Sequence, residues 1–198
     1  VGANEGAAGL DLVGLDGAPR ESIALPANPH DVALTPGGTA AWVSLDDSND
    51  LVFVDLNTAT VRRVSMPFRP HDLLVAPDGR VWVTKWGGGL ARLSPEGAVE
   101  ADLPVGEEVH HLAIALDGAQ VWATDNAGRA VLVIDAASAQ ELTSFRLDGS
   151  PHHVALTGDR AAVADNTRGV VAVFDAAARV PLGDVPVGPG PHGVWAAP

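Results

Sequence analysis

The sequence predicts an all-β fold of the β-propeller type, and three observations support this prediction. A histidine recurs every 39 to 42 residues, at His30, His71, His110, His152 and His192. A tryptophan follows at the same period, at Trp42, Trp82 and Trp122, with Ala162 at the next step. Each unit also contains four short apolar runs that are separated by turn-forming Gly, Pro and Asp residues. Four antiparallel strands in a unit of about 40 residues are typical of a propeller blade.

The four strands of each unit are expected at matching positions. The first strand follows the histidine, at 32–34, 73–75, 112–115 and 154–156. The second carries the tryptophan or alanine, at 41–44, 81–84, 121–124 and 161–164. The third is expected at 51–54, 90–93, 131–134 and 170–174, and the fourth at 61–64, 99–103, 142–147 and 181–185. Helical repeats of similar length need two amphipathic segments of about 10–15 residues, and none is present. By strand alternation, the three tryptophans are expected to pack inside the blades.

The 198 residues are expected to form one propeller domain of about five units. Units 30–70, 71–109, 110–151 and 152–191 are complete, whereas 1–29 and 192–198 are partial. The first partial unit supplies the end of a second strand, a third strand at 12–15 and a fourth at 22–25, and the last supplies a first strand. Either the two ends meet in a fifth blade or the units belong to a larger ring. Unpaired strand edges favour the larger ring.

Composition excludes several classes of function. Apolar residues make up 46% and charged residues 19%, as in folded globular proteins. The net charge of −13 disfavours a nucleic-acid partner. No apolar run approaches the roughly 18 residues of a membrane span. Cysteine is absent, which excludes disulfides and thiolate chemistry and suits a secreted or periplasmic protein, the location that we expect.

In a propeller the first strands line a central channel, so the five periodic histidines are expected around one channel mouth. The loop after each second strand should join them there, with Asp46, Lys85, Trp86, Asp125, Asn126, Asp165 and Asn166. These loop residues are the expected contacts for a small molecule or protein partner, and Trp86 is placed to stack on a ligand. By strand alternation, His111 and His153 are expected to point elsewhere.

The residues leave three interpretations of the histidines open. They can be structural, with each imidazole bonded to a neighbouring backbone group. They can also bind a divalent metal, Zn²⁺ or Cu²⁺, because neutral imidazole is a preferred ligand of both ions. The candidate ligands are the five periodic histidines His30, His71, His110, His152 and His192. In the third interpretation, one sector of the ring is catalytic.

The segment PHDVALTPGGTAAWVSLDDSNDLVFVDLNTATVRRV, residues 29–64, resembles a repeat of the YVTN class of bacterial propellers. The namesake residues of that class correspond here to Trp42-Val43-Ser44-Leu45 and its counterparts in the other units. The resemblance covers essentially the whole chain and implies the propeller fold. It implies little about activity, because propellers have many unrelated functions.

A second resemblance concerns one sector of the chain. RPHDLLVAPDGRVWVTKWGGGLARL, residues 69–93, is similar to a unit of the streptogramin B (virginiamycin B) lyases. That family opens cyclic depsipeptides by metal-dependent elimination across an ester C–O bond. The resemblance implies a site of His71, Glu108, His110 and Asp125, in which a histidine abstracts a proton α to a carbonyl and Mg²⁺ stabilises the enolate. Among the five periodic histidines, His110 alone has an acid two residues before it.

These observations favour an extracytoplasmic YVTN-like propeller that binds a ligand, metal or partner at a histidine-lined channel mouth. A metal-dependent C–O lyase with His71, Glu108 and His110 as catalytic residues is the enzymatic alternative. A structural or interaction module with inert histidines is the third. The sequence therefore leaves open whether the protein is an enzyme.

Overall fold

The computed structural model describes residues 1–14 and 16–196, and it confirms the all-β prediction. Five antiparallel sheets follow one another along the chain, and we call them blades 1 to 5. Blade 1 has three strands, β1 (Gly2–Asn4), β2 (Gly9–Val13) and β3 (Pro19–Ala24), with the 3₁₀ helix η1 (Glu5–Ala7) after β1. Among the described residues, no helix has the length and apolarity needed to cross a bilayer.

The other four blades have four strands each, paired in sequence order. Blade 2 contains β4 (Pro29–Leu34), β5 (Ala40–Leu45), β6 (Asp50–Asp55) and β7 (Thr60–Ser65). Blade 3 contains β8 (Pro70–Val75), β9 (Val81–Lys85), β10 (Leu90–Leu93) and β11 (Val99–Leu103). Blade 4 contains β12 (Val109–Ile114), β13 (Gln120–Asp125), β14 (Ala130–Asp135) and β15 (Gln140–Arg146). Blade 5 contains β16 (Pro151–Thr157), β17 (Arg160–Asp165), β18 (Val170–Asp175) and β19 (Val180–Pro186).

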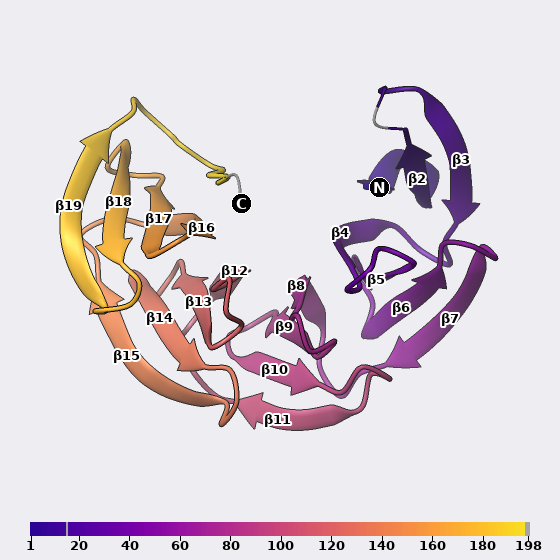
Figure 1. Cartoon of the computed structure of the whole chain (residues 1–198), viewed down its shortest axis with the longest axis horizontal. Helices are drawn as coiled ribbons and strands as arrows, with labels where there is room; N and C mark the ends of the chain where they lie inside the picture. The colour runs from indigo at the N-terminus through magenta and orange to yellow at the C-terminus, as the bar shows by residue number, and fades with distance from the viewer. Residues whose placement is uncertain (15, 197–198) are drawn as a thin grey trace.

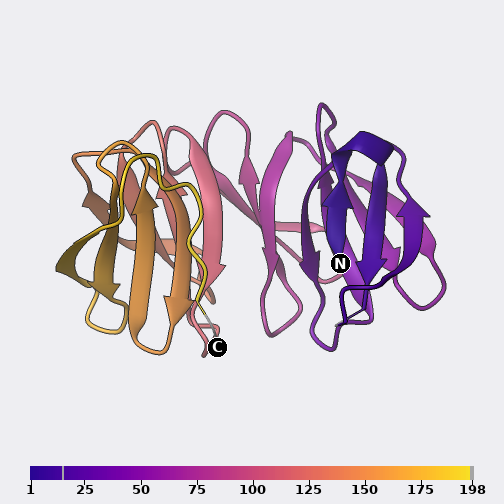
Figure 2. The same ribbon diagram turned by 90° about the horizontal axis from the view of Figure 1, so that it is seen from above.

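The blades are arranged around a common centre as an open arc (Figure 1). The first strands β4, β8, β12 and β16 lie on the inner side of the arc, and the fourth strands β7, β11, β15 and β19 lie on its outer side. Figure 2 shows the same blades from above, standing side by side. The predicted placement of the first strands on the inner side of the blades is therefore confirmed, and the described blades do not close into a ring.

The two ends of the chain do not assemble into a fifth four-stranded blade. Blade 1 keeps three strands, and residues 187–196 form no strand, contrary to the expectation for the C-terminal segment. A strand needs a hydrogen-bonded neighbour, and none of the described strands pairs with this segment. The strand that was predicted at 12–15 is β2 (Gly9–Val13), the middle strand of blade 1, and Leu15 lies outside the described residues.

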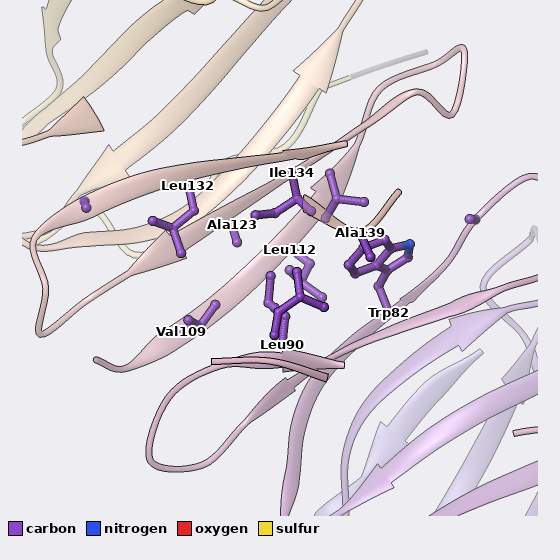
Figure 3. Close-up of a cluster of buried hydrophobic side chains, with 12 residues drawn as sticks. Trp82, Leu90, Val109, Leu112, Ala123, Leu132, Ile134 and Ala139 are labelled. Carbon is purple, nitrogen blue, oxygen red and sulfur yellow. The ribbon is translucent and has the colours of Figure 1, made fainter. Parts of the chain in front are cut away.

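Apolar clusters between neighbouring blades form the core. Trp42, Trp82 and Trp122 are each at most 1% exposed, as the sequence predicted. In the cluster between blades 3 and 4, Trp82 packs with Leu112 and Ile134 (Figure 3). The equivalent clusters on either side contain Trp42 and Trp122. Each tryptophan therefore joins its own blade to the next one along the chain.

Candidate functional site: a histidine-lined channel mouth

Each inner strand begins with a β-bulge, and this bulge positions the histidines. The pairing register shifts between Pro29 and Val32, and it shifts at the equivalent place in the three blades that follow. Two residues, the histidine and the one after it, therefore lie in the gap between regular pairs. In blades 2 to 4, the residue after the histidine has a backbone N–H that is not paired within the sheet at the bulge. A buried hydroxyl group of the second strand accepts this N–H. Ser44 accepts from Asp31 at 3.1 Å, Thr84 from Asp72 at 2.8 Å and Thr124 from His111 at 3.1 Å.

The structure brings the five periodic histidines into one continuous series, which we call the histidine row. Its members are His30, His71, His110, His152 and His192. Ring centroids of successive members are 4.4, 4.9, 4.1 and 4.0 Å apart. Imidazoles from neighbouring blades are therefore in contact along the inner side of the arc.

The expectation that His111 and His153 point away from the other histidines is wrong. Their rings stack on each other at 4.0 Å, and the His153 ring lies 4.9 Å from that of His192 and 5.5 Å from that of His152. The physical reason is the bulge, because it interrupts the alternation on which the expectation was based. All seven histidines consequently form one connected cluster.

A second series of residues follows the histidine row by one position, and we call it the inner row. It comprises Asp31, Asp72, His111 and His153. Its side chains link successive blades, because three of them accept a backbone N–H from the next blade. Leu73 donates to Asp31 at 3.0 Å, Leu112 to Asp72 at 3.2 Å and Val154 to His111 at 3.4 Å. Sequence analysis missed the two aspartates, although comparing the units column by column would have placed them beside the two histidines.

The buried histidines are poor bases in this setting. Burial, followed by the neighbouring imidazoles, lowers the pKa of His110 to about 3, of His111 to about 3 and of His152 to about 4. The pKa values of His71 and His153 are lowered chiefly by burial as well. These five imidazoles are therefore neutral near pH 7, and the neutral form has the lone pair that a metal requires.

The opposite shift occurs at Asp72 in the inner row. Burial, and then the charge of Asp31, raises the pKa of Asp72 well above its usual value. In its protonated form Asp72 can donate a hydrogen bond to the carboxylate of Asp31. His111 Nε2 lies 3.8 Å from Asp72 Oδ2. The inner row thus combines a proton-sharing carboxyl pair with two neutral imidazoles.

Three histidines have the geometry of a metal site. A nitrogen of His110, of His152 and of His153 lie within 4.8 Å of one another. Zinc at about 2.0–2.1 Å from each of three nitrogens would need them roughly 3.3 Å apart, which small side-chain rotations can provide. The Nδ1 atoms of His110 and His152 are buried and have no hydrogen-bond partner. Leaving a buried polar atom without a hydrogen-bond partner costs about 1–3 kcal/mol of folding stability. A bound metal ion would remove this cost by accepting the lone pair of the nitrogen.

The residues implied by the lyase resemblance are only partly brought together. His71, Glu108 and His110 line one pocket with Lys85 and Trp86, and its volume is about 10 Å³, the space of a single water molecule. Asp125 performs a different task. Its buried carboxylate accepts the backbone N–H groups of Glu107, Glu108 and Gly128 at 3.0, 2.8 and 3.0 Å. These bonds hold the loops on either side of it.

Most of the predicted loop contacts also bond within the protein. Asp165 accepts backbone N–H groups of Ser150 and Arg168, as Asp125 does in the preceding blade. Asn126 bonds to Ser150, Asn166 donates to the carbonyl of Pro191, and Lys85 pairs with Asp102. These contacts indicate loop positioning.

Trp86 is the exception among the loop residues. Its side chain is 45% exposed, with the Arg69 guanidinium 4.7 Å above the ring and the His71 ring edge-on at 4.5 Å. It therefore presents an aromatic surface beside the histidine row.

The repeated blades and the inner strands around a channel make this protein a β-propeller. A solved structure described as Kuenenia stuttgartiensis hydrazine synthase is similar to it with a TM-score of 0.75 and 19% identity. The alignment covers 81% of this chain and 49% of that chain, so this chain spans about half the length of the solved one. At that identity the likeness supports the fold alone. No family model and no curated protein matches the sequence.

Proposed function

We propose that this propeller binds a transition-metal ion, Zn²⁺ or Cu²⁺, through His110, His152 and His153. The observation that carries the proposal is the convergence of three imidazoles, of which two have a buried, unpaired Nδ1. Imidazole nitrogen suits Zn²⁺ and Cu²⁺, whereas Mg²⁺ prefers oxygen ligands. The low pKa values of His110 and His152 support the same choice, because protons compete weakly with the metal there.

Three histidines leave one position of a tetrahedral ion open. His192 is a candidate for the fourth ligand, with its ring 4.0 Å from that of His152 and 4.9 Å from that of His153. A water or a small anionic ligand is the alternative fourth ligand. The open position is where a small molecule or protein partner at the channel face would contact the ion.

The test is metal binding by the full chain after treatment with a chelator. We expect Zn²⁺ or Cu²⁺ to be retained at one equivalent through gel filtration and to raise the Tm, because a ligand of the folded state alone stabilises it. His152→Asn should abolish this retention. His30→Asn is the matched control, since it changes the same row outside the trio and should leave Zn²⁺ retention intact. Equal retention by His152→Asn and the parent chain would rule the proposal out.

A metal-dependent C–O lyase is a second candidate function, supported by the shared pocket of His71, Glu108 and His110. It requires Mg²⁺ rather than Zn²⁺, and the same experiment separates the two. A rise in Tm with Mg²⁺ that Glu108→Gln abolishes, together with cleavage of a cyclic depsipeptide, would favour the lyase. For either function we propose a secreted or periplasmic location, which the resemblance to the YVTN class of bacterial propellers supports.

A further inference from the structure

The ionisable groups of the channel mouth differ between its two halves. The inner row has aspartates in blades 2 and 3, at Asp31 and Asp72, and histidines in blades 4 and 5, at His111 and His153. Blade 1 and the loop of blade 2 add Glu5 and Asp46. Within the inner row, oxygen donors therefore lie in blades 2 and 3, and nitrogen donors lie in blades 4 and 5.

Within blades 1 and 2, three side chains converge. A ligand atom of Glu5, of His30 and of Asp46 lie within 4.8 Å of one another, and His30 Nδ1 is 3.7 Å from Asp46 Oδ1. Glu5 belongs to η1 of blade 1, whereas His30 and Asp46 come from blade 2. The two carboxylates and one imidazole therefore meet across a blade boundary.

Local hydrogen bonds fix the backbone beneath two of these side chains. The Asn4 side chain caps η1 by accepting the Ala7 N–H at 3.2 Å, which orders the turn that carries Glu5. The N–H of Asp46 donates to the carbonyl of Asn28 at 2.8 Å, which ties the loop of Asp46 to the strand that carries His30. The donors are thus held on ordered backbone.

The electrostatic setting also favours a cation. No Arg or Lys among the described residues forms an ion pair with Glu5 or Asp46, whereas the adjacent Asp47 pairs with Arg69 at 2.9 Å. Asp31 and Asp46 both act electrostatically on His71, the next member of the histidine row. The negative charge at this end of the row is therefore uncompensated by basic side chains.

We propose that Glu5, His30 and Asp46 form a second cation site, selective for an oxygen-preferring divalent ion such as Mn²⁺. Two carboxylates and one imidazole suit Mn²⁺, and three imidazoles suit Zn²⁺ or Cu²⁺. The channel mouth would then hold two ions of different chemistry, one at each end of the histidine row, with His71 between the two sites. The second site does not depend on occupation of the first.

The experiment measures Mn²⁺ binding to the chelator-treated full chain by equilibrium dialysis and by the loss of the free Mn²⁺ EPR signal. We expect one bound equivalent, and Asp46→Asn should weaken Mn²⁺ binding by at least about tenfold. Asp47→Asn is the matched control, because it removes an adjacent, exposed carboxylate that already pairs with Arg69. It should leave Mn²⁺ binding within about twofold of the parent. Zn²⁺ retention, measured in parallel, should survive Asp46→Asn.

The outcomes separate this site from the first one. Two separate sites are supported if Asp46→Asn loses Mn²⁺ binding but retains Zn²⁺, and His152→Asn loses Zn²⁺ but still binds Mn²⁺. Equal weakening by Asp46→Asn and Asp47→Asn would show diffuse attraction to surface charge and overturn the second site. Absence of Mn²⁺ binding to the parent chain would overturn it as well, whatever the result for Zn²⁺. Circular dichroism of each variant verifies that it is folded.

Discussion

At the scale of single residues, the position after the channel histidine has two roles in blades 2 to 4. It accepts an N–H from the next blade, and it lies beside other ionisable groups at a bulge. Asp31, Asp72 and His111 fill the first role with oxygen or nitrogen acceptors. Because aspartate and histidine both accept hydrogen bonds and both bind metals, this position can change chemistry without losing its structural contact.

The lowered histidine pKa values predict that the metal-free protein loses stability in mild acid. The pKa of His110 is about 3 in the folded chain and 6.5 in the unfolded chain, so the unfolded state binds protons first as the pH falls. The histidine contribution to stability should therefore be complete above about pH 7 and decline as the pH drops from about 6.5 towards about 3. Urea titrations at several pH values measure this decline.

His111→Asn should reduce that decline, because it removes a group whose pKa falls to about 3 on burial. His192→Asn is the control, since that histidine is exposed. A stability that stays constant between pH 7 and pH 4 in the parent chain would contradict the prediction.

At the scale of the elements, local sequence determined the strands but not their irregularities. The third and fourth strands of blade 3 were predicted with their observed bounds, because turn residues flank both runs. The inner strands were predicted to begin after the histidine, whereas β4, β8 and β16 begin at the proline before it. Their bulges depend on pairing with another strand, and a single run of residues does not reveal such pairing.

In the candidate site too, some features could be predicted from the sequence, whereas others depend on the folded structure. Periodicity alone predicted that the five members of the histidine row share one channel mouth. Inclusion of His153 in the metal trio required the bulge, and the bonding of Asp125 to three backbone N–H groups required the folded loop. Glu5 escaped prediction because blade 1 begins part-way through a unit, which hides its equivalence to the other loops.

A tryptophan pair tests the energetic role of the blade interfaces. Trp82→Ala should destabilise the chain by about 3–5 kcal/mol, because it opens a cavity between blades 3 and 4. Trp86→Ala removes a side chain that is 45% exposed and should cost roughly 1 kcal/mol or less. Guanidinium titrations compare the two variants. Similar losses in both would show that the interface cluster contributes less than its burial indicates.

At the scale of the whole molecule, stability should vary along the arc. Among the described residues, blades 2, 3 and 4 of this chain pack against a neighbour on both sides, and blades 1 and 5 each pack against one (Figure 1). In repeat proteins stability is approximately a sum of units and nearest-neighbour interfaces.

We therefore expect slow amide hydrogen exchange in β9, β10, β13 and β14 and faster exchange in β2 and β18. Peptide-resolved exchange measured by mass spectrometry tests this order. β10, β14 and β18 are the third strands of their blades, and β2 has the equivalent place in blade 1. Comparing these four strands therefore keeps the position within a blade constant. Uniform protection across all five blades would contradict a sum of nearest-neighbour interfaces.

The hydrogen bonds of the inner row also bear on how such a chain can evolve. In each bond the earlier blade supplies the side chain and the later blade supplies the N–H. The contact therefore has a constant direction, and in-frame duplication or deletion of a whole unit would recreate it at every new junction. Gene duplication can change the number of units while the junctions remain compatible, and later substitution at one position can then change which ionisable group the inner row presents.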